Sequence, residues 1–305
     1  MVKEGLYFNE PFSEDYIRSF KIDKLLYQGR SKYQMIQCFT NQFFGKMLFL
    51  DKKIQSAQVD EYVYHESLVH PVMLSHPNPK HVLILGGGEG ATIREVLRYP
   101  EVEKVTMVDI DKKLIEICKQ CLPEWSKGAF DHPKTELIIG DARRFVEETQ
   151  DKYDIIISDL TEPVNKGPSV MLFTQEFYHL ISSKLKNNGF FVMQAGSTDM
   201  IHHDFFVSCY QTLKKAFPLV KPFWVFVLSF GLPWGFLGAA KDGMSLDTDG
   251  EKTGSRFDAL NREGVRFYRP EMHRSYFVLP VYLFNSLDKG KGKVITDKNP
   301  YIWTL

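Results

Sequence analysis

Residues 81–91, HVLILGGGEGA, constrain the fold of this chain more than any other segment. The hydrophobic run Val82–Leu85 passes into the glycine-rich turn Gly86–Gly90, and a helical pattern follows. A buried parallel strand, a glycine turn and a helix N-terminus form the nucleotide-binding corner of a doubly wound α/β sheet. The sequence therefore predicts such a sheet, with a ligand site that begins at this turn.

Glu89 narrows the kind of ligand that this turn can accept. The spacing Gly86-x-Gly88-x-x-Ala91 fits the dinucleotide fingerprint. However, a carboxylate inside the loop repels a pyrophosphate that rests on the helix N-terminus. An adenosine ligand with a cationic tail suits Glu89 better, so a dinucleotide dehydrogenase is the less favoured alternative.

From residue 81 onward, apolar strand patterns alternate with helical patterns, as in a parallel sheet covered by helices. Strands are predicted over 81–85, 104–108, 135–139, 153–158, 189–194 and 223–228. Helices are predicted over 91–99, 111–121, 142–149, 174–186 and 203–217. The polar segment 242–254 is predicted to be a flexible loop.

The first 75 residues have a different pattern. Short, partly alternating segments separated by Gly, Asn and Asp predict an antiparallel β domain of hairpins. These segments are 25–28, 33–39, 46–50 and 54–57. We therefore expect an N-terminal β-hairpin domain over 1–75 and a Rossmann-like, methyltransferase-type α/β domain over 76–305.

Charge and hydrophobicity limit the partners and the location. Lys plus Arg and Asp plus Glu each total 38, which disfavours a broad nucleic-acid surface. No run approaches about 18 apolar residues, so no membrane span is expected. The N-terminus lacks the apolar core of a signal peptide, and we expect a cytoplasmic protein.

Cys118 and Cys121 have the CxxC spacing, but no second cysteine or histidine pair at metal-finger spacing accompanies them. Their helical context favours small buried residues over a metal or redox site. No metal site is predicted.

Acidic residues follow four successive predicted strands. Glu89 lies in the first turn, Asp109 ends the second strand, Asp141 follows the third, and Asp159 and Glu162 follow the fourth. Since ligands of such sheets bind beyond the carboxyl ends of the strands, these acids should share one rim. The position of Asp109 suits ribose hydroxyls, and Asp141 could accept from an adenine amino group.

These acids have a plainer interpretation, because Asp commonly caps the helix that follows a strand. For Asp111 or Asp141 alone, capping and ligand binding are equally good explanations. Together, however, the carboxylates repel one another unless a cation, hydroxyls or an amine satisfies them. Hard-metal sites usually take clustered acids from one or two elements, so a ribose plus a polyamine fits this spread better.

Four motifs, at residues 55–66, 86–91, 140–143 and 159–163, together resemble the polyamine aminopropyltransferases, the spermidine, spermine and thermospermine synthase family. The resemblance extends from about Tyr7 to the C-terminus. It implies decarboxylated S-adenosylmethionine as a co-substrate, with no cofactor. It also implies a small-molecule amine acceptor such as putrescine, agmatine or spermidine. Sheet edges in the β domain offer surfaces for subunit pairing, so a homodimer or homotetramer is expected.

The resemblance also implies roles for individual residues. Asp159 would be the catalytic proton acceptor. The donor would be bound by Gln34, Glu89, Asp109, Asp141, Ala142 and Pro168. The acceptor would be bound by Tyr64, His65, Glu89, Asp159, Glu162 and Gln194. The chemistry independently requires a base, because an alkylammonium with a pKa of about 10 must lose a proton before it attacks a sulfonium carbon.

Three positions depart from the common family pattern. Glu89 and Glu162 stand where Asp is usual, and Phe230 stands where spermidine synthases carry a tyrosine. Glu89, Gln194–Gly196 and Trp234–Gly235 look more like thermospermine synthases and the thermophile-type bacterial and archaeal branch. We therefore expect an acceptor longer than putrescine, such as agmatine or spermidine, to be used at least as well as putrescine.

Two rival functions stay open at this point. A small-molecule methyltransferase that uses S-adenosylmethionine would share the fold and the ribose acid, but Glu89 would repel the carboxylate of that donor. A non-catalytic polyamine-binding protein is the other alternative, and the retained Asp159 argues against it.

Overall fold

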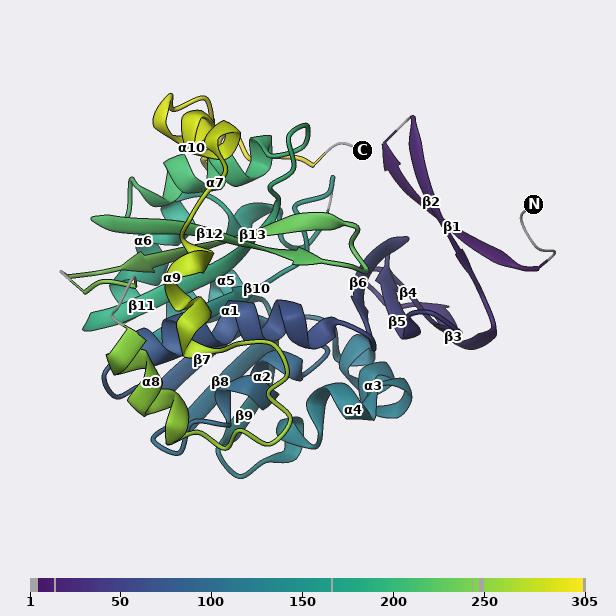
Figure 1. Ribbon diagram of the computed structural model, residues 1–305, viewed down its shortest axis with the longest axis horizontal. Helices are drawn as coiled ribbons and strands as arrows, with labels where there is room; N and C mark the ends of the chain where they lie inside the picture. The colour runs from purple at the N-terminus through teal and green to yellow at the C-terminus, as the bar shows by residue number, and fades with distance from the viewer. Residues whose placement is uncertain (1–4, 14, 166, 243, 247–249, 304–305) are drawn as a thin grey trace.

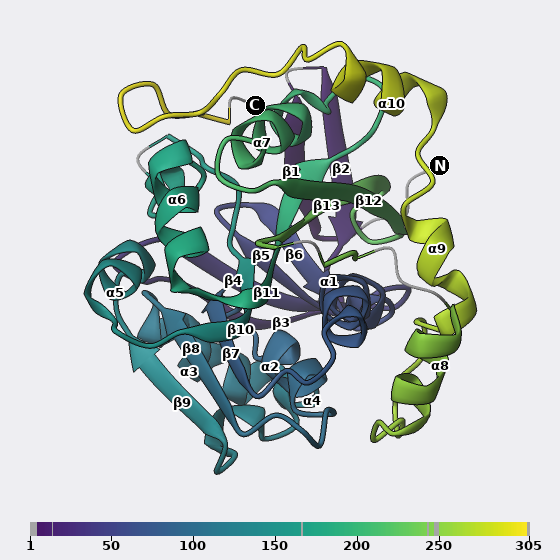
Figure 2. The same ribbon diagram turned by 90° about the vertical axis from the view of Figure 1, so that its left-hand side faces the viewer.

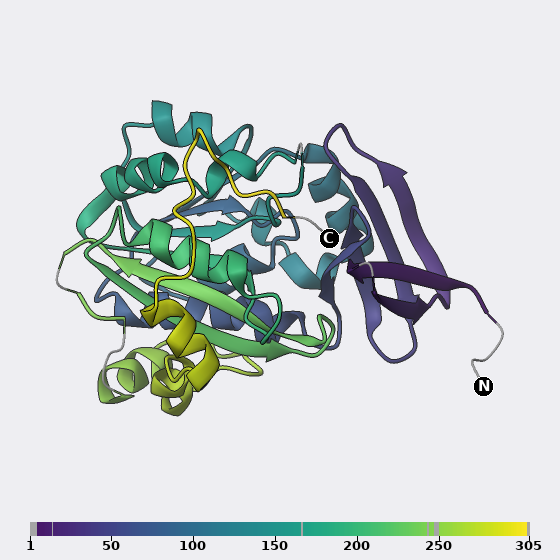
Figure 3. The same cartoon turned by 90° about the horizontal axis from the view of Figure 1, so that it is seen from above.

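The computed structural model describes residues 5–13, 15–165, 167–242, 244–246 and 250–303. An N-terminal β region projects from a larger α/β body (Figure 1). The view from above places this β region, the strands β1–β6, at one end of the molecule (Figure 3). Among the described residues, no helix is long and apolar enough to cross a membrane.

The N-terminal region contains two antiparallel sheets. The first is a hairpin of β1 (Tyr7–Ser13) and β2 (Tyr16–Lys21). The second has the order β3-β4-β5-β6, with bounds Lys24–Arg30, Met35–Asn41, Gly45–Leu50 and Lys53–Ala57. The hairpins predicted between residues 25 and 57 are confirmed. The β1–β2 hairpin was not predicted, because Pro11 interrupts its strand pattern.

The α/β body is built on a sheet with the order β12-β13-β11-β10-β7-β8-β9. The strands are β7 (His81–Gly86), β8 (Lys104–Asp109), β9 (Thr135–Ile139), β10 (Tyr153–Asp159), β11 (Leu185–Ser197), β12 (Leu219–Val227) and β13 (Leu232–Ala240). The strands β7 to β11 pair in parallel, which confirms the predicted Rossmann-like arrangement.

The last two strands differ from the predicted alternation. The segment predicted as a strand at 223–228 is β12, which runs antiparallel to its neighbour β13. A tight turn joins the two: the amide of Gly231 donates to the Leu228 carbonyl at 2.9 Å, and Gly231 has φ +63°. Because the connection is a hairpin without a helix, the parallel pattern ends at β11.

Helices cover both faces of this sheet (Figure 2). Alternate residues of β7 point to opposite faces: Val82 and Ile84 join one core, while Leu83 and Leu85 join the other. The helices are α1 (Glu61–Ser75), α2 (Ala91–Val96), α3 (Lys112–Cys121), α4 (Pro123–Ser126), α5 (Ala142–Glu148), α6 (Gln175–Lys184), α7 (Asp204–Leu213), α8 (Gly250–Asp258), α9 (His273–Tyr276) and α10 (Val281–Asp288). Short 3₁₀ turns occupy Ala129–Asp131, Val170–Leu172 and Pro270–Met272.

The predicted loop at 242–254 is tested only in part. Residues 243 and 247–249 lie outside the described residues, and the segment from Gly250 onward begins α8. The described end of the segment is therefore helical, in contrast to the prediction.

The topology places a crevice beside the glycine turn. The chain runs outward through β7, β8 and β9 and then returns to form β10 on the other side of β7. Ligands of open α/β sheets bind at such a switch point, beyond the carboxyl ends of the strands. Gly86, with φ +80°, lies against the backbone of Asp159, where a Cβ atom would collide with the Asp159 carbonyl. Glycine at 86 therefore lets the two strand ends meet.

Candidate active site

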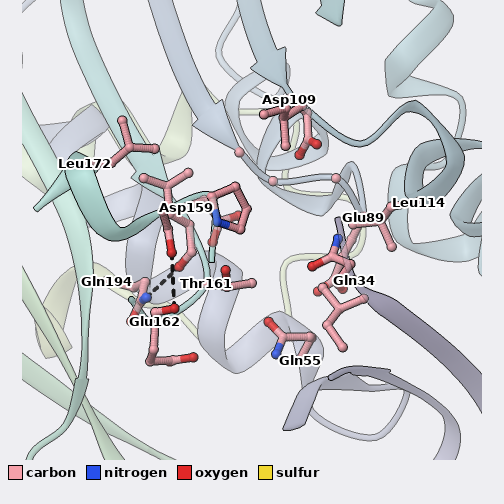
Figure 4. A pocket seen from close by; sticks show the side chains of 18 of the residues that line it. Gln34, Gln55, Glu89, Asp109, Leu114, Asp159, Thr161, Glu162, Leu172 and Gln194 are labelled. Atoms are coloured by element: carbon pink, nitrogen blue, oxygen red, sulfur yellow. Dashed lines mark hydrogen bonds between the residues drawn. The ribbon is translucent and has the colours of Figure 1, made fainter. Parts of the chain in front are cut away.

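A cavity opens at the carboxyl ends of β7, β8 and β10, under the N-terminal β region (Figure 4). Of the eleven residues predicted from the sequence, ten line this cavity and His65 does not. The ten are Gln34, Tyr64, Glu89, Asp109, Asp141, Ala142, Asp159, Glu162, Pro168 and Gln194. Figure 4 shows Asp159 and Glu162 on one side of the cavity and Glu89 and Gln34 on the other.

The residues expected to contact adenosine form one end of the cavity, which we call the donor end: Gln34, Asp109, Asp141 and Ala142. Asp109 is buried at the end of β8, where its carboxylate accepts the Asp111 amide at 2.8 Å. Burial is the main cause that raises the pKa of Asp109 to about 6, and the charges of Asp111 and Asp159 add to it. A ligand that supplies hydroxyl donors would stabilise the carboxylate form.

Capping and cavity lining coexist at the donor end. Asp141 caps α5 by accepting the Arg144 amide at 2.9 Å, and it also lines the cavity. Asp111 caps α3 through the Leu114 amide at 3.2 Å and accepts from the side chains of Ser31 and Gln34 at 2.6 and 2.9 Å. Asp111 therefore fastens the β3–β4 turn, which carries Gln34, onto the α/β body.

Asp159 lines the cavity, and two hydroxyl groups hold its carboxylate. Tyr64 donates to Oδ1 at 2.7 Å, and Thr92 donates to Oδ2 at 2.5 Å. The two donors come from α1 and α2, the helices that precede and follow β7. They fix the orientation of the carboxylate, which is what a general base needs. Thr92 was not predicted, because a threonine in the first turn of a helix carries no special sequence signal.

Glu89 extends from the glycine turn to the wall formed by the N-terminal sheet. Its carboxylate accepts from the Ser56 hydroxyl at 2.5 Å. Burial raises the pKa of Glu89 to about 7, while the charge of His65 and the Ser56 hydrogen bond oppose that rise. Glu89 thus takes its charge most readily when a cation lies beside it.

The residues Tyr64, Glu162, Phe230 and Trp234 form the opposite end of the cavity, which we call the acceptor end. The rings of Phe230 and Trp234 meet edge to face with centroids 4.8 Å apart. Burial raises the pKa of Glu162 to about 6, although Lys53 lowers it. This end therefore combines an acid with aromatic walls, as a site for an alkylamine requires.

The polar side-chain atoms of Gln194 and His65 form hydrogen bonds with other groups of the protein. The Gln194 amide donates to the Leu160 carbonyl at 2.5 Å and accepts from the Gly196 amide at 2.9 Å, so both ends of its amide hold backbone. His65 lies behind Tyr64, with ring centroids 5.0 Å apart, and its Nδ1 lies 2.9 Å from the Glu61 carboxylate. The ligand contacts of both residues stay predictions.

A second cavity adjoins the acceptor end and shares Ile54, Glu162, Phe230 and Trp234 with it. Its other lining residues are Glu10, Phe12, Arg18, Lys53, Val164, Ser197, Leu232 and Trp303. Glu10 is buried and pairs with Arg18 at 2.7 Å, and the Lys53 ammonium donates to the Pro11 carbonyl. No sequence pattern predicted this cavity, because its walls come from segments that lie far apart in the chain.

Among the described residues, neither the possible metal ligands nor the cysteines form a second candidate site. No three His, Cys, Asp or Glu side chains there are grouped as metal ligands would be. Of the CxxC pair, Cys118 is buried as predicted, whereas Cys121 is partly exposed; both thiols are free, as is that of the buried Cys38. Burial raises the pKa of the Cys38 thiol to about 12 and that of the Cys118 thiol well above its usual value, so neither is a reactive thiolate.

Comparison with known proteins gives a consistent result along most of the chain. The spermine/spermidine synthase domain matches residues 61–248, and the spermidine synthase tetramerisation domain matches residues 7–58. A polyamine aminopropyltransferase from Sulfolobus acidocaldarius is 43% identical over 279 residues, 92% of each chain. Polyamine aminopropyltransferase 2 from Hyperthermus butylicus is 40% identical over 282 residues, again 92% of each chain.

Two solved structures have the same fold. A spermidine synthase in complex with the transition state analogue AdoDATO superposes with a TM-score of 0.87 at 32% identity. Spermidine synthase from Thermotoga maritima superposes with a TM-score of 0.85 at 32% identity. Each comparison covers 94% of this chain and 96% of the other.

Proposed function

Because the chain belongs to the spermine/spermidine synthase family, we propose that it transfers the aminopropyl group of decarboxylated S-adenosylmethionine to an amine acceptor. The reaction releases 5′-methylthioadenosine and serves polyamine biosynthesis. The observation that carries this proposal is the position of Asp159. Its carboxylate is oriented by Tyr64 and Thr92, and it lies between a donor end suited to adenosine and an acceptor end suited to an amine.

In the proposed reaction, the acceptor nitrogen attacks the propyl carbon that is bonded to the sulfonium. The C–N bond forms, the C–S bond breaks, and its electron pair returns to sulfur. An alkylammonium has no free lone pair, so one proton must leave before or during the attack. Asp159 takes this proton, and the Tyr64 and Thr92 hydroxyls keep its carboxylate in line with the attacking nitrogen.

Glu89 selects between the two possible donors by charge. The decarboxylated donor has an ammonium group at the end of its propyl chain, whereas intact S-adenosylmethionine has a carboxylate beside that ammonium. A buried carboxylate attracts the first and repels the second. The methyltransferase alternative is therefore disfavoured by the same residue that favours aminopropyl transfer.

The acceptor belongs to the diamine or polyamine class, and we propose that chains longer than putrescine are used at least as well as putrescine. The second cavity supports this proposal, because it continues past Glu162 and Phe230 and gives a longer chain room. Arg18 and Lys53, the cations of this cavity, limit how much a longer acceptor can gain in binding. A distal ammonium would compete there with Arg18 for Glu10 and with Lys53 for Glu162.

Assembly and location complete the proposal. The match of residues 7–58 to a tetramerisation domain supports an oligomer built through the N-terminal β region. We propose a homodimer or homotetramer, located in the cytoplasm.

A turnover assay tests the function directly. The protein is incubated with decarboxylated S-adenosylmethionine and with putrescine, agmatine, cadaverine or spermidine in turn, and 5′-methylthioadenosine and the amine product are measured by mass spectrometry. We expect aminopropylated product with the decarboxylated donor. When intact S-adenosylmethionine replaces that donor, we expect no methylated amine. Methyl transfer would support the methyltransferase alternative, and amine binding without turnover would support a polyamine-binding protein.

A further inference from the structure

Behind the acids of the cavity runs a buried chain of hydrogen bonds from His65 to Glu89. The Glu61 carboxylate contacts His65 on one side and the Arg94 guanidinium on the other. Arg94 donates to the Trp125 carbonyl at 2.7 Å, and the Trp125 indole donates to Ser56 Oγ at 3.0 Å. Ser56 in turn donates to the Glu89 carboxylate, which lines the cavity.

The geometry determines which nitrogen of His65 carries a proton. Nδ1 lies 2.9 Å from a Glu61 carboxylate oxygen and 2.7 Å from the Glu61 carbonyl oxygen. Because a carbonyl oxygen can only accept, Nδ1 must be the donor. The orientation of the imidazole is therefore fixed by Glu61, as a carboxylate fixes the histidine in other catalytic arrangements.

Arg94 fixes Glu61 in the same way. Both Glu61 oxygens accept from the Arg94 guanidinium at 3.0 Å, which is the bidentate geometry that arginine favours. The remaining Arg94 nitrogen donates to Glu95 at 2.7 Å. Glu61 and Arg94 are about nine-tenths buried, so little water competes for these bonds.

Three acids from three elements act on the charge of His65: Glu61 on α1, which contacts it, Glu89 in the turn after β7 and Asp159 at the end of β10. Burial lowers the pKa of His65, but the hydrogen bond and charge of Glu61, followed by the charges of Glu89 and Asp159, raise it to about 9. This pKa favours the imidazolium form of His65 at neutral pH, close to two acids that the proposed reaction uses.

We propose that Glu61 and Arg94 are positioning residues for aminopropyl transfer: they hold His65 as a cation, and that cation favours the ionised form of Glu89, which receives a substrate ammonium. This inference rests on the proposed function of the cavity. Without the imidazolium, Glu89 and Asp159 would face each other uncompensated, and one of them would more readily take up a proton. Neither Glu61 nor Arg94 is among the residues that line the cavity, so they act through His65 and Ser56.

The test compares Glu61→Gln with the unmutated full-length protein, using histidine-ring NMR titration without substrates and steady-state kinetics. The His65 signal is assigned by its loss in His65→Asn. We expect the His65 titration midpoint to fall by at least about one unit, the usual effect of losing one adjacent opposite charge. The KM for the decarboxylated donor should rise about tenfold, the effect of weakening one charged hydrogen bond, while kcat changes less.

Two further variants make the test decisive. Glu61→Asp keeps the charge one methylene further from the ring, so the His65 midpoint and the KM should both lie close to those of the unmutated protein. This variant also serves as the test if Glu61→Gln does not fold. Glu101→Gln removes a different ion pair, the one with Arg256, and should leave the His65 midpoint and the KM unchanged. An unmoved midpoint, or a moved midpoint with an unmoved KM, would overturn the inference.

The inference and the proposed function fail separately. If the unmutated protein forms no 5′-methylthioadenosine with any acceptor, the proposed function fails. The NMR titration would still report whether Glu61 holds His65 as a cation.

Discussion

The donor end and the acceptor end of the cavity are built in different ways. Asp109 and Asp141 come from the ends of successive parallel strands, and each makes a local hydrogen bond to the backbone two or three residues further on. At the acceptor end, Glu162, Tyr64 and Phe230 come from three distant parts of the chain. Apart from Gln34, which is brought in by the β3–β4 turn, the donor end is thus fixed by local rules of the α/β fold. The acceptor end depends throughout on how separate segments pack.

This difference has a functional consequence. A donor end that follows from strand-end geometry can bind the same nucleoside in every member of a family. An acceptor end assembled from distant segments can change with one substitution in any of them. We therefore expect substitutions at the centre of the cavity to abolish chemistry, and those at the acceptor end to change which amine is used.

The largest effect is expected at Asp159, where the two ends meet. Asp159→Asn keeps the side-chain shape but cannot take a proton, so kcat should fall by roughly a hundredfold or more, as for a lost general base. Donor affinity, measured by calorimetry, should change little. Asp258→Asn, an exposed substitution on α8, serves as the control. Normal turnover of Asp159→Asn near neutral pH would mean that another group is the base.

The next effect concerns Glu89, which we assign to the donor ammonium. Glu89→Gln should weaken binding of the decarboxylated donor by about tenfold to a hundredfold, because one charged hydrogen bond contributes on the order of 1.5–3 kcal/mol. Its advantage over intact S-adenosylmethionine should narrow accordingly. Calorimetric titration of both donors measures this difference. Equal affinities in the unmutated protein would contradict the charge-selection argument.

The acids of the cavity also predict how stability depends on pH. The pKa values of Glu89, Asp109 and Glu162 are raised to about 7, 6 and 6 in the folded protein. At a pH between the unfolded-state pKa and the folded-state pKa of each acid, the folded protein therefore binds more protons than the unfolded chain. Stability should therefore decrease as pH rises through this window. His65, with its pKa raised to about 9, adds stability below its unfolded pKa that is lost as pH rises through 9.

Thermal unfolding of the ligand-free protein between pH 5.5 and 8 measures this dependence. We expect the melting temperature to fall by a few degrees, and Glu89→Gln to reduce the slope. A melting temperature that rises with pH over this range would show that the cavity acids do not dominate the balance.

The contrast between the two ends also explains how much the sequence could predict. The strands β7 to β11 and the acids that follow them were found because a buried strand, a turn and a helix leave a continuous local pattern. The β12–β13 hairpin was not recognised, because its direction is set by the turn at Gly231 and by pairing with β11. The same local rules could not distinguish capping from ligand binding at Asp141, which caps α5 and also lines the cavity.

Side chains that form hydrogen bonds with residues far away in the sequence could not be predicted from a sequence pattern. Thr92 and Ser56 are ordinary hydroxyl residues whose importance comes from the carboxylates that they meet in space. Arg18 pairs with Glu10 inside its own hairpin and donates to backbone carbonyls of the β12–β13 turn, more than 200 residues away. Such contacts can be seen only once the N-terminal β region is packed against the sheet.

Lys53 offers a way to sharpen the comparison at the acceptor end. Burial lowers the pKa of Lys53, and the charges of Glu10 and Glu162 offset only part of that effect. Lys53→Met removes a cation that competes with a distal acceptor ammonium. We expect kcat/KM for spermidine to rise severalfold relative to putrescine, with donor affinity unchanged. A change in donor affinity instead would show that the two ends are not independent.

An effect of similar size is expected at Phe230, which contacts Trp234 and lines both cavities. If this phenyl ring is the reason that a short diamine has no advantage, then Phe230→Tyr should shift kcat/KM toward putrescine by about twofold to tenfold, the effect of one hydrogen bond of ordinary strength.

The unmutated protein should use agmatine or spermidine at least as well as putrescine, and kcat/KM is the quantity that measures such discrimination. A clear preference of the unmutated protein for putrescine would contradict the proposed acceptor length. In that case, the longer side chain of Glu162 would be enough to hold a short diamine without a tyrosine hydroxyl, and the acceptor end would be less variable than its assembly from distant segments suggests.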